Sequence, residues 1–298
     1  MSIAQAEARE LAIEQPAGLW SDAFDRLKRN PSAIVGAVLI LTFVVTAILA
    51  PWIAPHGPNE QVGSLSGNGI PPGDGHLFGL DKQGRDYFSR VVYGARLSLL
   101  VGVVSVAVGL GLGLVLGATA GYFGKWVDNL IMRAMDVVLS VPAFLLAIGL
   151  VTLLGRGLLQ IMFAVGLTTV PIFARLLRGS ILAQRESEYA LAARSIGVPG
   201  RRLLLRHILP NSVSPVIVQG TLTVATAIIE VAALSFVGLG PADPGLPEWG
   251  KMLADSASRL QSGAHLVFFP GMAIVISTLG FNMIGDGLRE AIDPKLRA

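Results

Sequence analysis

The feature that most constrains the fold is a set of long apolar stretches that contain almost no charge. A helix that crosses the ~30 Å hydrocarbon core of a membrane needs about 20 mostly apolar residues. The only charged residue within these stretches is Glu230. The sequence therefore predicts an all-α integral membrane protein with six transmembrane helices, at about 34–54, 97–120, 137–154, 157–174, 213–239 and 266–285.

The distribution of Lys and Arg predicts how these helices are oriented. With six spans both tails lie on the same side of the membrane, and basic residues favour the cytoplasmic side. If the tails are cytoplasmic, 16 of the 23 Lys and Arg fall in inside segments and 7 in outside segments. Both termini are therefore expected in the cytoplasm, together with the arginine-rich segment 175–212. Because topology explains the placement of the positive charge, no nucleic-acid partner is expected.

These spans divide the chain into five regions. Residues 1–33 form a cytoplasmic tail, in which the helical spacing of Trp20, Phe24 and Leu27 predicts an interfacial helix. Residues 34–54 are the first transmembrane helix, and 55–96 form an extracytoplasmic loop that ends in a predicted interfacial helix, DYFSRVVYGARLSLL. Residues 97–285 form a five-helix core that includes the cytoplasmic segment 175–212. Residues 286–298 form a second cytoplasmic tail.

The second span contains a regular glycine repeat. Four glycines follow one another at intervals of four residues and so lie on one helix face: Gly109, Gly113, Gly117 and Gly121. Glycine removes side-chain bulk and allows another helix backbone to approach closely. Packing within the same bundle is the favoured interpretation, and an interface with a second subunit is the alternative.

The single acid inside a span, Glu230, calls for a partner. An ionised acid at that depth costs roughly 2.5–3.5 kcal/mol or more, so such groups are usually paired. An interhelical hydrogen bond that fixes packing is favoured over a role in the transport path. A proton relay is disfavoured because no His, Lys or Arg accompanies Glu230 within the spans.

Motifs that carry catalysis or bind metals and nucleotides are missing. The chain has no cysteine, and its four histidines lack metal-ligand spacing. The two Gly-Lys pairs are followed by Trp126 and Met252 instead of Ser or Thr, so there is no phosphate-binding loop. No catalytic residue, metal site or cofactor is expected on this chain. A membrane enzyme is disfavoured for the same reason, and a secondary transporter because coupling-ion residues and inverted repeats are not visible.

The segment 175–212 carries a pattern that charge alone does not explain. A small apolar stripe, Tyr189, Ala192, Ala193 and Ile196, predicts one short helix. Gly197 then stands where a helix end needs a left-handed residue, and Pro199 suits the start of a second helix that Pro210 stops. A basic loop held by anionic headgroups would need no such order. The segment therefore predicts a helix-turn-helix between spans four and five that presents alanines and arginines to a partner.

This segment resembles the EAA loop of ABC importer permeases. Ala192, Ala193, Gly197, Leu209 and Pro210 match its pattern, whereas Leu191 stands at the glutamate position and His207 at a later isoleucine position. In the family that glutamate makes an ionic contact with the ATPase, which here is left to Glu188 or the arginines. The resemblance implies a set of ATPase-coupling residues: Glu188, Tyr189, Leu191, Ala192, Ala193, Arg194, Gly197, Arg201, Arg202, Arg206, His207 and Pro210.

More narrowly, the chain resembles the C-type permease subunits of dipeptide, oligopeptide and nickel importers. Five blocks carry this resemblance in the family's order: 76–99, 121–142, 188–211, 234–253 and 281–297. It implies a bacterial cytoplasmic-membrane protein with a B-type partner permease and an extracytoplasmic substrate-binding protein. It also implies one or two cytoplasmic ATPase subunits, which bind the ATP and Mg²⁺. The cargo would be a dipeptide or longer peptide, with nickel or another small solute as the alternative.

Overall fold

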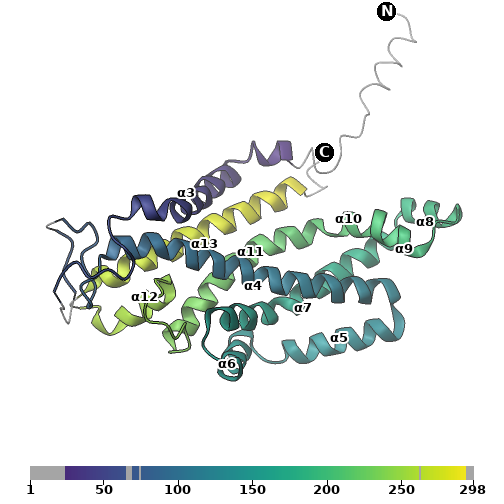
Figure 1. Cartoon of the computed structure of the whole chain (residues 1–298). Helices are drawn as coiled ribbons and strands as arrows, with labels where there is room; N and C mark the ends of the chain where they lie inside the picture. The colour runs from purple at the N-terminus through teal and green to yellow at the C-terminus, as the bar shows by residue number, and fades with distance from the viewer. Residues whose placement is uncertain (1–23, 65–68, 74, 262, 293–298) are drawn as a thin grey trace, which may run out of the picture.

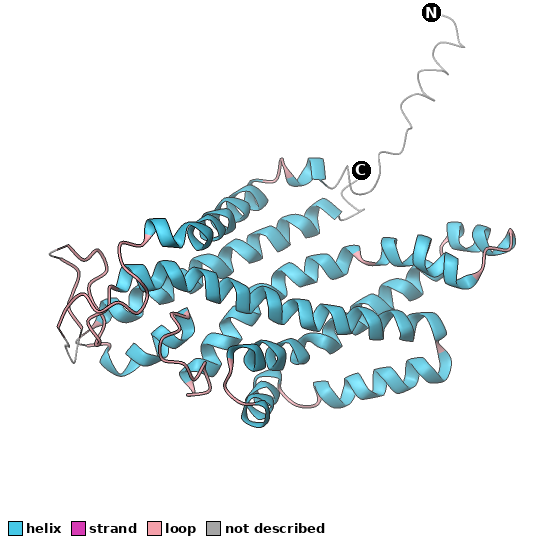
Figure 2. Cartoon of the chain, in the orientation of Figure 1, coloured by secondary structure: helices cyan, strands magenta, loops and turns pink. Residues whose placement is uncertain are grey.

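The computed structural model describes residues 24–64, 69–73, 75–261 and 263–292. This part of the chain is helical, and its only β-structure consists of isolated bridges in the loop between the first two long helices. Figures 1 and 2 show the long helices lying side by side in one elongated bundle. Five of them are long and apolar enough to cross a membrane: α3 (Pro31–Ile53), α4 (Tyr87–Phe123), α7 (Leu158–Arg185), α11 (Ser214–Phe236) and α13 (Ala264–Ile292).

The predicted third span is not one straight helix. The chain forms α5 (Lys125–Leu139) and α6 (Ala143–Leu154), which meet at an angle of 89°. Pro142 disfavours helical conformation in the residue before it, and Pro142 itself is the N-cap of α6, with φ −52° and ψ 131°. The apolar run 137–154 therefore spans a corner, and α5 and α6 together make the sixth crossing only if the bent pair counts as one span.

Several helices also extend past their expected ends. Asp86 starts α4 by accepting hydrogen bonds from the amide (2.8 Å) and hydroxyl (2.6 Å) of Ser89. Residues 87–96 therefore belong to the same continuous helix as the second span, and the separate interfacial helix expected there is wrong. Likewise α7 continues through the first eleven residues of the segment 175–212, and α13 continues beyond residue 285. Of the predicted N-terminal interfacial helix, 24–27 are helical and Trp20 lies outside the described residues.

The ends of the bundle have different characters. The Asn30 amide donates to the Glu290 carboxylate at 2.5 Å, so the start of α3 and the end of α13 lie together. The loop between α3 and α4 lies at the opposite end, as Figure 1 shows. The short helices that follow α7 project from the same end as the start of α3 and the end of α13 (Figure 1). One chain thus presents a helical projection at one end of the bundle and an irregular loop at the other.

Candidate coupling and transport sites

The projection after α7 begins with a short helix. α8 (Glu188–Ser195) starts after Ser187, and its only buried residue is Ala190. Gly197 follows with φ +80°, which confirms the left-handed turn predicted there. The turn closes through hydrogen bonds from Gly197 N–H to the Arg194 carbonyl (3.0 Å) and from Val198 N–H to the Ala193 carbonyl (3.1 Å). This pairing ties the end of α8 to the start of the next helix.

The second helix of the projection does not stop at Pro210. α9 (Gly200–Leu203) leads into a π-helical turn at Leu204–Ile208, and then α10 (Leu209–Ser212) contains Pro210. The wide turn is closed by the Leu209 N–H, which donates to the Leu204 carbonyl five residues earlier. A proline ring crowds the carbonyl four residues before it in an α-helix. The π-turn directly before Pro210 relieves that crowding, so the helix continues.

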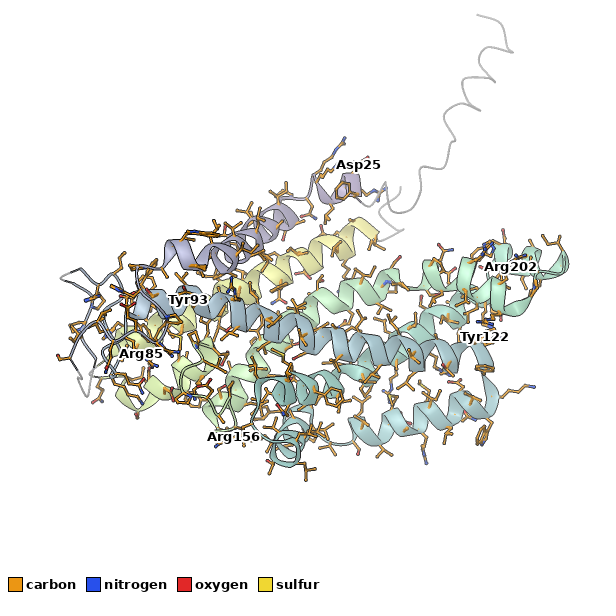
Figure 3. All side chains as sticks on the ribbon, in the orientation of Figure 1. Asp25, Arg85, Tyr93, Tyr122, Arg156 and Arg202 are labelled. Carbon is orange, nitrogen blue, oxygen red and sulfur yellow. The ribbon has the colours of Figure 1, made fainter. Side chains whose placement is uncertain are left out.

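Most residues predicted to couple to an ATPase lie on the open surface of this projection. Glu188, Tyr189, Leu191, Ala192, Arg194 and Gly197 are exposed, and Ala193 is partly buried. On the second helix Arg201, Arg202, Arg206, His207 and Pro210 are exposed, whereas Leu204 and Ile208 are buried. Figure 3 places Arg202 on the projection, next to the end of α4 that carries Tyr122. The structure therefore gathers the predicted set onto one exposed element.

The projection exposes apolar residues. Ile196 at the turn is 82% exposed, and Leu191, which occupies the position of the family glutamate, is 47% exposed. The exposed tip thus combines apolar side chains with arginines. A cavity of about 380 Å³ lies behind the tip, lined by Tyr122, Arg185, Arg194, Val198, Gly200, Leu203, Leu204 and Ile208.

The seven arginines of 175–212 fall into two groups. Arg178 makes a bidentate ion pair with Asp128 of α5, with Nη2 to Oδ2 at 2.6 Å. Arg175 pairs with Asp136 on the same helix, and Arg185 donates to the Gly121 carbonyl at 2.8 Å. These three tie α7 to α5 and to the end of α4. The other four, Arg194, Arg201, Arg202 and Arg206, are exposed on the projection.

The glycine repeat of α4 faces α7 of the same chain. All four glycines are buried, and a methyl group added at Gly117 would lie 2.5 Å from the Ala174 carbonyl oxygen. At Gly109 it would lie 2.6 Å from the Gly166 carbonyl oxygen. At Gly113 it would lie 2.5 Å from the Phe173 side chain, and at Gly121 it would lie 2.9 Å from the Ile181 side chain. The repeat therefore brings α4 into backbone contact with the helix that leads into the projection.

Glu230 lies on α11 without a partner among the described residues. Its side chain is partly buried, and the Oε2 atom is buried without a hydrogen bond. The interhelical hydrogen bond favoured from the sequence is therefore not formed with any described part of this chain.

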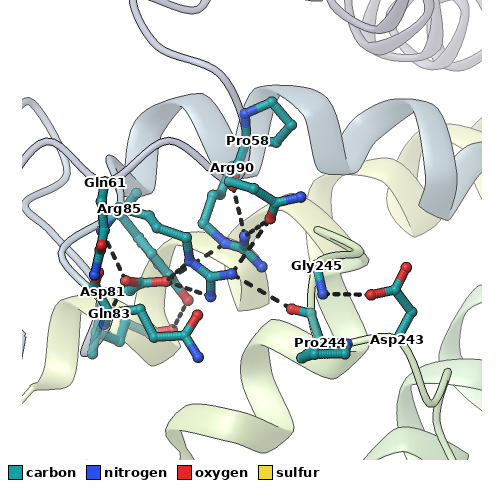
Figure 4. Close-up of polar contacts among 12 residues, drawn as sticks. Pro58, Gln61, Asp81, Gln83, Arg85, Arg90, Asp243, Pro244 and Gly245 are labelled. Carbon is teal, nitrogen blue, oxygen red and sulfur yellow. Dashed lines mark hydrogen bonds and ion pairs between the residues drawn. The ribbon is translucent and has the colours of Figure 1, made fainter.

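The end of the bundle opposite the projection holds a charged cluster that the sequence analysis did not identify (Figure 4). The Asp81 carboxylate accepts a hydrogen bond from the Arg85 side chain at 2.7 Å and further hydrogen bonds from the backbone N–H groups of Gln83 and Arg85. Arg90 donates to the Pro58 carbonyl at 2.7 Å, and Arg85 reaches the Pro244 carbonyl at 3.5 Å. The cluster thus joins three segments distant in sequence, and only the spacing of Asp81, Arg85 and Arg90 could have indicated it.

A second polar group near the same end was also missed. The Glu248 carboxylate is buried at the start of α12 (Trp249–Ser256) and accepts from the Gly250 and Lys251 amides at 2.8 and 2.7 Å. The hydroxyls of Ser98 on α4 and Ser235 on α11 also donate to it, at 3.3 and 3.4 Å. Burial raises the pKa of the Glu248 carboxyl, and these four donors oppose the increase. Glu248 therefore holds α12 against two long helices.

Comparisons with known proteins agree with this architecture. Residues 113–298 match the family described as "Binding-protein-dependent transport system inner membrane component". The chain therefore belongs to this family and is a multi-pass membrane permease of ABC transport. Residues 18–72 match a second family, "N-terminal TM domain of oligopeptide transport permease C", which confirms the narrower resemblance to the C-type subunits.

Two relatives align over nearly the whole chain. The dipeptide transport system permease protein DppC of Alkalihalophilus pseudofirmus is 48% identical over 279 residues, 94% of this chain and 91% of the relative. The glutathione transport system permease protein GsiD of Escherichia coli is 42% identical over 278 residues, 93% and 91% of the two chains.

A solved structure shares the fold. A chain of the MetNI methionine ABC transporter in an inward-facing conformation superposes with a TM-score of 0.56 at 18% identity, over 68% of this chain and 96% of that one. At this identity the likeness describes the fold alone.

Proposed function

We propose that this chain is one of two different membrane subunits of an ATP-driven importer of dipeptides or oligopeptides. The main support for this function is the exposed projection between α7 and α11, with its left-handed turn at Gly197, in a chain that belongs to this permease family. Relatives named for dipeptide and glutathione transport support a peptide cargo and do not favour nickel. A partner permease of the B type, cytoplasmic ATPases and an extracytoplasmic binding protein complete the assembly. In this proposal ATP and Mg²⁺ bind to the ATPase subunits.

The proposed docking of the projection also suggests an orientation, with both termini in the cytoplasm. Docking to a cytoplasmic ATPase places the end of the bundle with Arg202 inside the cell, which also puts the start of α3 and the end of α13 there. The α5–α6 pair then counts as the sixth crossing. The segments 81–96 and 247–259, at the other end, face the binding protein. The Lys and Arg distribution favours the same orientation.

The contacts of α7 suggest how movement is transmitted. ATP binding closes the two ATPases, and the seated projection moves with them as a rigid body. Because Arg178 and Arg175 tie α7 to α5, and the glycine repeat ties it to α4, these three helices move together. The result is a tilt that alternates access between the two sides of the membrane.

Substitution of Gly197 tests this coupling. A methyl group at Gly197 would meet no atom within 4 Å, so only its φ of +80° restricts the side chain. Valine resists that conformation and asparagine adopts it readily. In proteoliposomes containing the whole transporter, Gly197→Val is expected to abolish ATP-driven peptide uptake and Gly197→Asn to retain it.

A second substitution tests contact instead of conformation. Ala193→Trp places bulk on the partly buried face of α8 and is expected to block binding of the ATPase subunits. Co-purification of the subunits measures this directly. ATP-driven uptake at the normal rate by either Gly197→Val or Ala193→Trp would refute the proposed coupling role.

A further inference from the structure

One face of α11 carries a line of polar side chains. Gln219, Thr226 and Glu230 are separated by seven and four residues, and Thr223 lies between the first two. Seven and eleven residues are close to two and three turns of an α-helix, so these side chains share one face. The Gln219 amide donates to the Thr223 hydroxyl at 3.3 Å, which places those two side chains together.

This polar line borders an open surface of the bundle. Thr226 is exposed, Gln219 and Glu230 are partly exposed, and Thr223 is buried. At its cytoplasmic end the line opens into a groove of about 490 Å³ that Gln219 lines together with Arg289 of α13. An open surface with amide, hydroxyl and carboxylate groups does not suit the hydrocarbon core, because lipid offers these groups no partners.

Other open surfaces of the bundle are different in composition. The exposed side chains of α3 are predominantly apolar and include Val38, Leu41 and Ile48, which are 57–61% exposed. Its exposed Thr42 donates its hydroxyl proton to the Val38 carbonyl of the same helix. Such a surface suits lipid. In contrast to α3, the α11 face carries a carboxylate without a hydrogen-bond partner among the described residues, a group that calls for water or a polar solute.

Within this polar line, Glu230 is the residue whose side chain lacks a hydrogen-bond partner among the described residues. Thr223 and Thr226 donate their hydroxyl protons to carbonyls of their own helix, at 2.7 and 2.9 Å. The Glu230 carboxylate accepts no hydrogen bond from any described residue, and its Oε2 atom is buried. Gln219 and Glu230 are about 16 Å apart along the helix axis, so Glu230 lies well beyond the cytoplasmic groove.

We propose that the α11 face formed by Gln219, Thr223, Thr226 and Glu230 lines the solute path, and that Glu230 binds the ammonium group of a passing peptide. This inference rests on the proposed function and extends it to a particular wall and a particular group of the solute. A carboxylate without an internal partner is suited to a transient cationic ligand, because no ion pair within the protein must break before the solute binds. The free N-terminus of a peptide is such a ligand.

Cysteine labelling tests the wall without requiring transport. The chain has no native cysteine, so a single introduced thiol on it can be followed by mass spectrometry. In the assembled transporter, Thr226→Cys is expected to react with a membrane-impermeant cationic methanethiosulfonate at least about tenfold faster than Leu41→Cys, since the thiolate reacts only where water reaches it. Equal, slow labelling of the two variants would mean that α11 faces lipid or a packed interface, and would overturn the proposal.

Uptake measurements test the role of Glu230. The probes are dialanine, trialanine and glutathione, and the uptake of each is measured in a separate experiment with proteoliposomes. Glu230→Gln is expected to reduce uptake about tenfold or more, while ATP hydrolysis stimulated by the binding protein stays within about twofold of the wild type. Glu230→Asp keeps the charge and is expected to restore at least half of the uptake. Asp25→Asn removes an exposed acid at the end of the bundle and is expected to change neither quantity.

The possible results separate the two proposals. Normal uptake by Glu230→Gln would refute the ammonium contact, and so would loss of uptake in which Glu230→Asp is as inactive as Glu230→Gln. A wild-type transporter that imports none of the three probes would refute the proposed cargo for peptides of two or three residues. Labelling of Thr226→Cys would still report whether α11 faces an aqueous path.

Discussion

The contact between α4 and α7 predicts a large difference between two substitutions on the same helix. Gly117→Ala would place a methyl carbon 2.5 Å from the Ala174 carbonyl oxygen and 3.1 Å from its Cα, whereas Gly111→Ala would meet nothing within 4 Å. Both changes raise helix propensity by about 0.5–1 kcal/mol, so this effect cancels in the comparison. The remaining difference is the cost of overpacking, about 1–3 kcal/mol, because backbone atoms cannot rotate away as a side chain can.

Thermal unfolding of the purified chain in detergent measures this difference. For a chain of this size 1 kcal/mol corresponds to roughly 2 °C in Tm, so Gly117→Ala is expected to melt about 2–6 °C below Gly111→Ala. Gly111→Ala should match or slightly exceed the wild type. Equal melting temperatures for the two variants would show that α4 and α7 do not approach as closely as the structure indicates.

Four other substitutions test polar contacts. Asp128→Asn is expected to reduce the free energy of unfolding by about 1–2 kcal/mol, because it leaves the partly exposed Arg178 without its carboxylate. The ion pair between Asp136 and Arg175 is about half exposed, so Asp136→Asn is expected to reduce the free energy of unfolding by at most about 1 kcal/mol. Equal losses for Asp128→Asn and Asp136→Asn would contradict the difference in burial between the two ion pairs. Burial raises the pKa of Glu248 in the folded state above the ordinary 4.5, so the folded protein binds this proton more tightly than the unfolded chain. The resulting contribution to stability is complete below pH 4.5 and is lost as the pH rises through the raised pKa. The Tm of the wild type should therefore fall relative to that of Glu248→Gln as the pH increases above 4.5 and through the raised pKa, and a constant difference would refute this. Asp81→Asn weakens the charged cluster that holds Arg85, so trypsin is expected to cleave after Lys82 or Arg85 faster than in the wild type. An unchanged cleavage rate would count against a structural role for the cluster.

The long apolar stretches allowed most of the fold to be predicted, because length and hydropathy are local properties of the sequence. The turn at Gly197 was predictable for the same reason, since a left-handed residue at a helix end favours glycine. Pro142 indicated a kink or a helix end within the apolar run 137–154, but the size of the bend, 89°, could not be predicted, because hydropathy does not specify the direction of a helix. Pro210 was misinterpreted in the opposite sense, since a π-turn lets the helix continue through it.

Contacts between distant segments could not be predicted. Arg178 and Asp128 lie 50 residues apart, and only the packing of α5 against α7 brings them together. The same holds for Arg85 and Pro244 at the other end of the bundle. Hydrophobic period and local propensity describe one element at a time, whereas these pairs depend on how elements are arranged.

The division of the arginines gives the segment 175–212 a mechanical interpretation. Arg175, Arg178 and Arg185 lie on α7 and bind groups of α5 and α4, so they belong to the bundle. The four arginines after the turn at Ser187 have no such partners among the described residues and remain available to another protein. Force applied to the projection therefore enters α7 at its end, and the three internal contacts pass it to two more helices within about three turns. A basic loop held only by lipid would need neither the internal contacts nor their position directly before the projection, so the arrangement favours transmission of movement over attachment to the membrane.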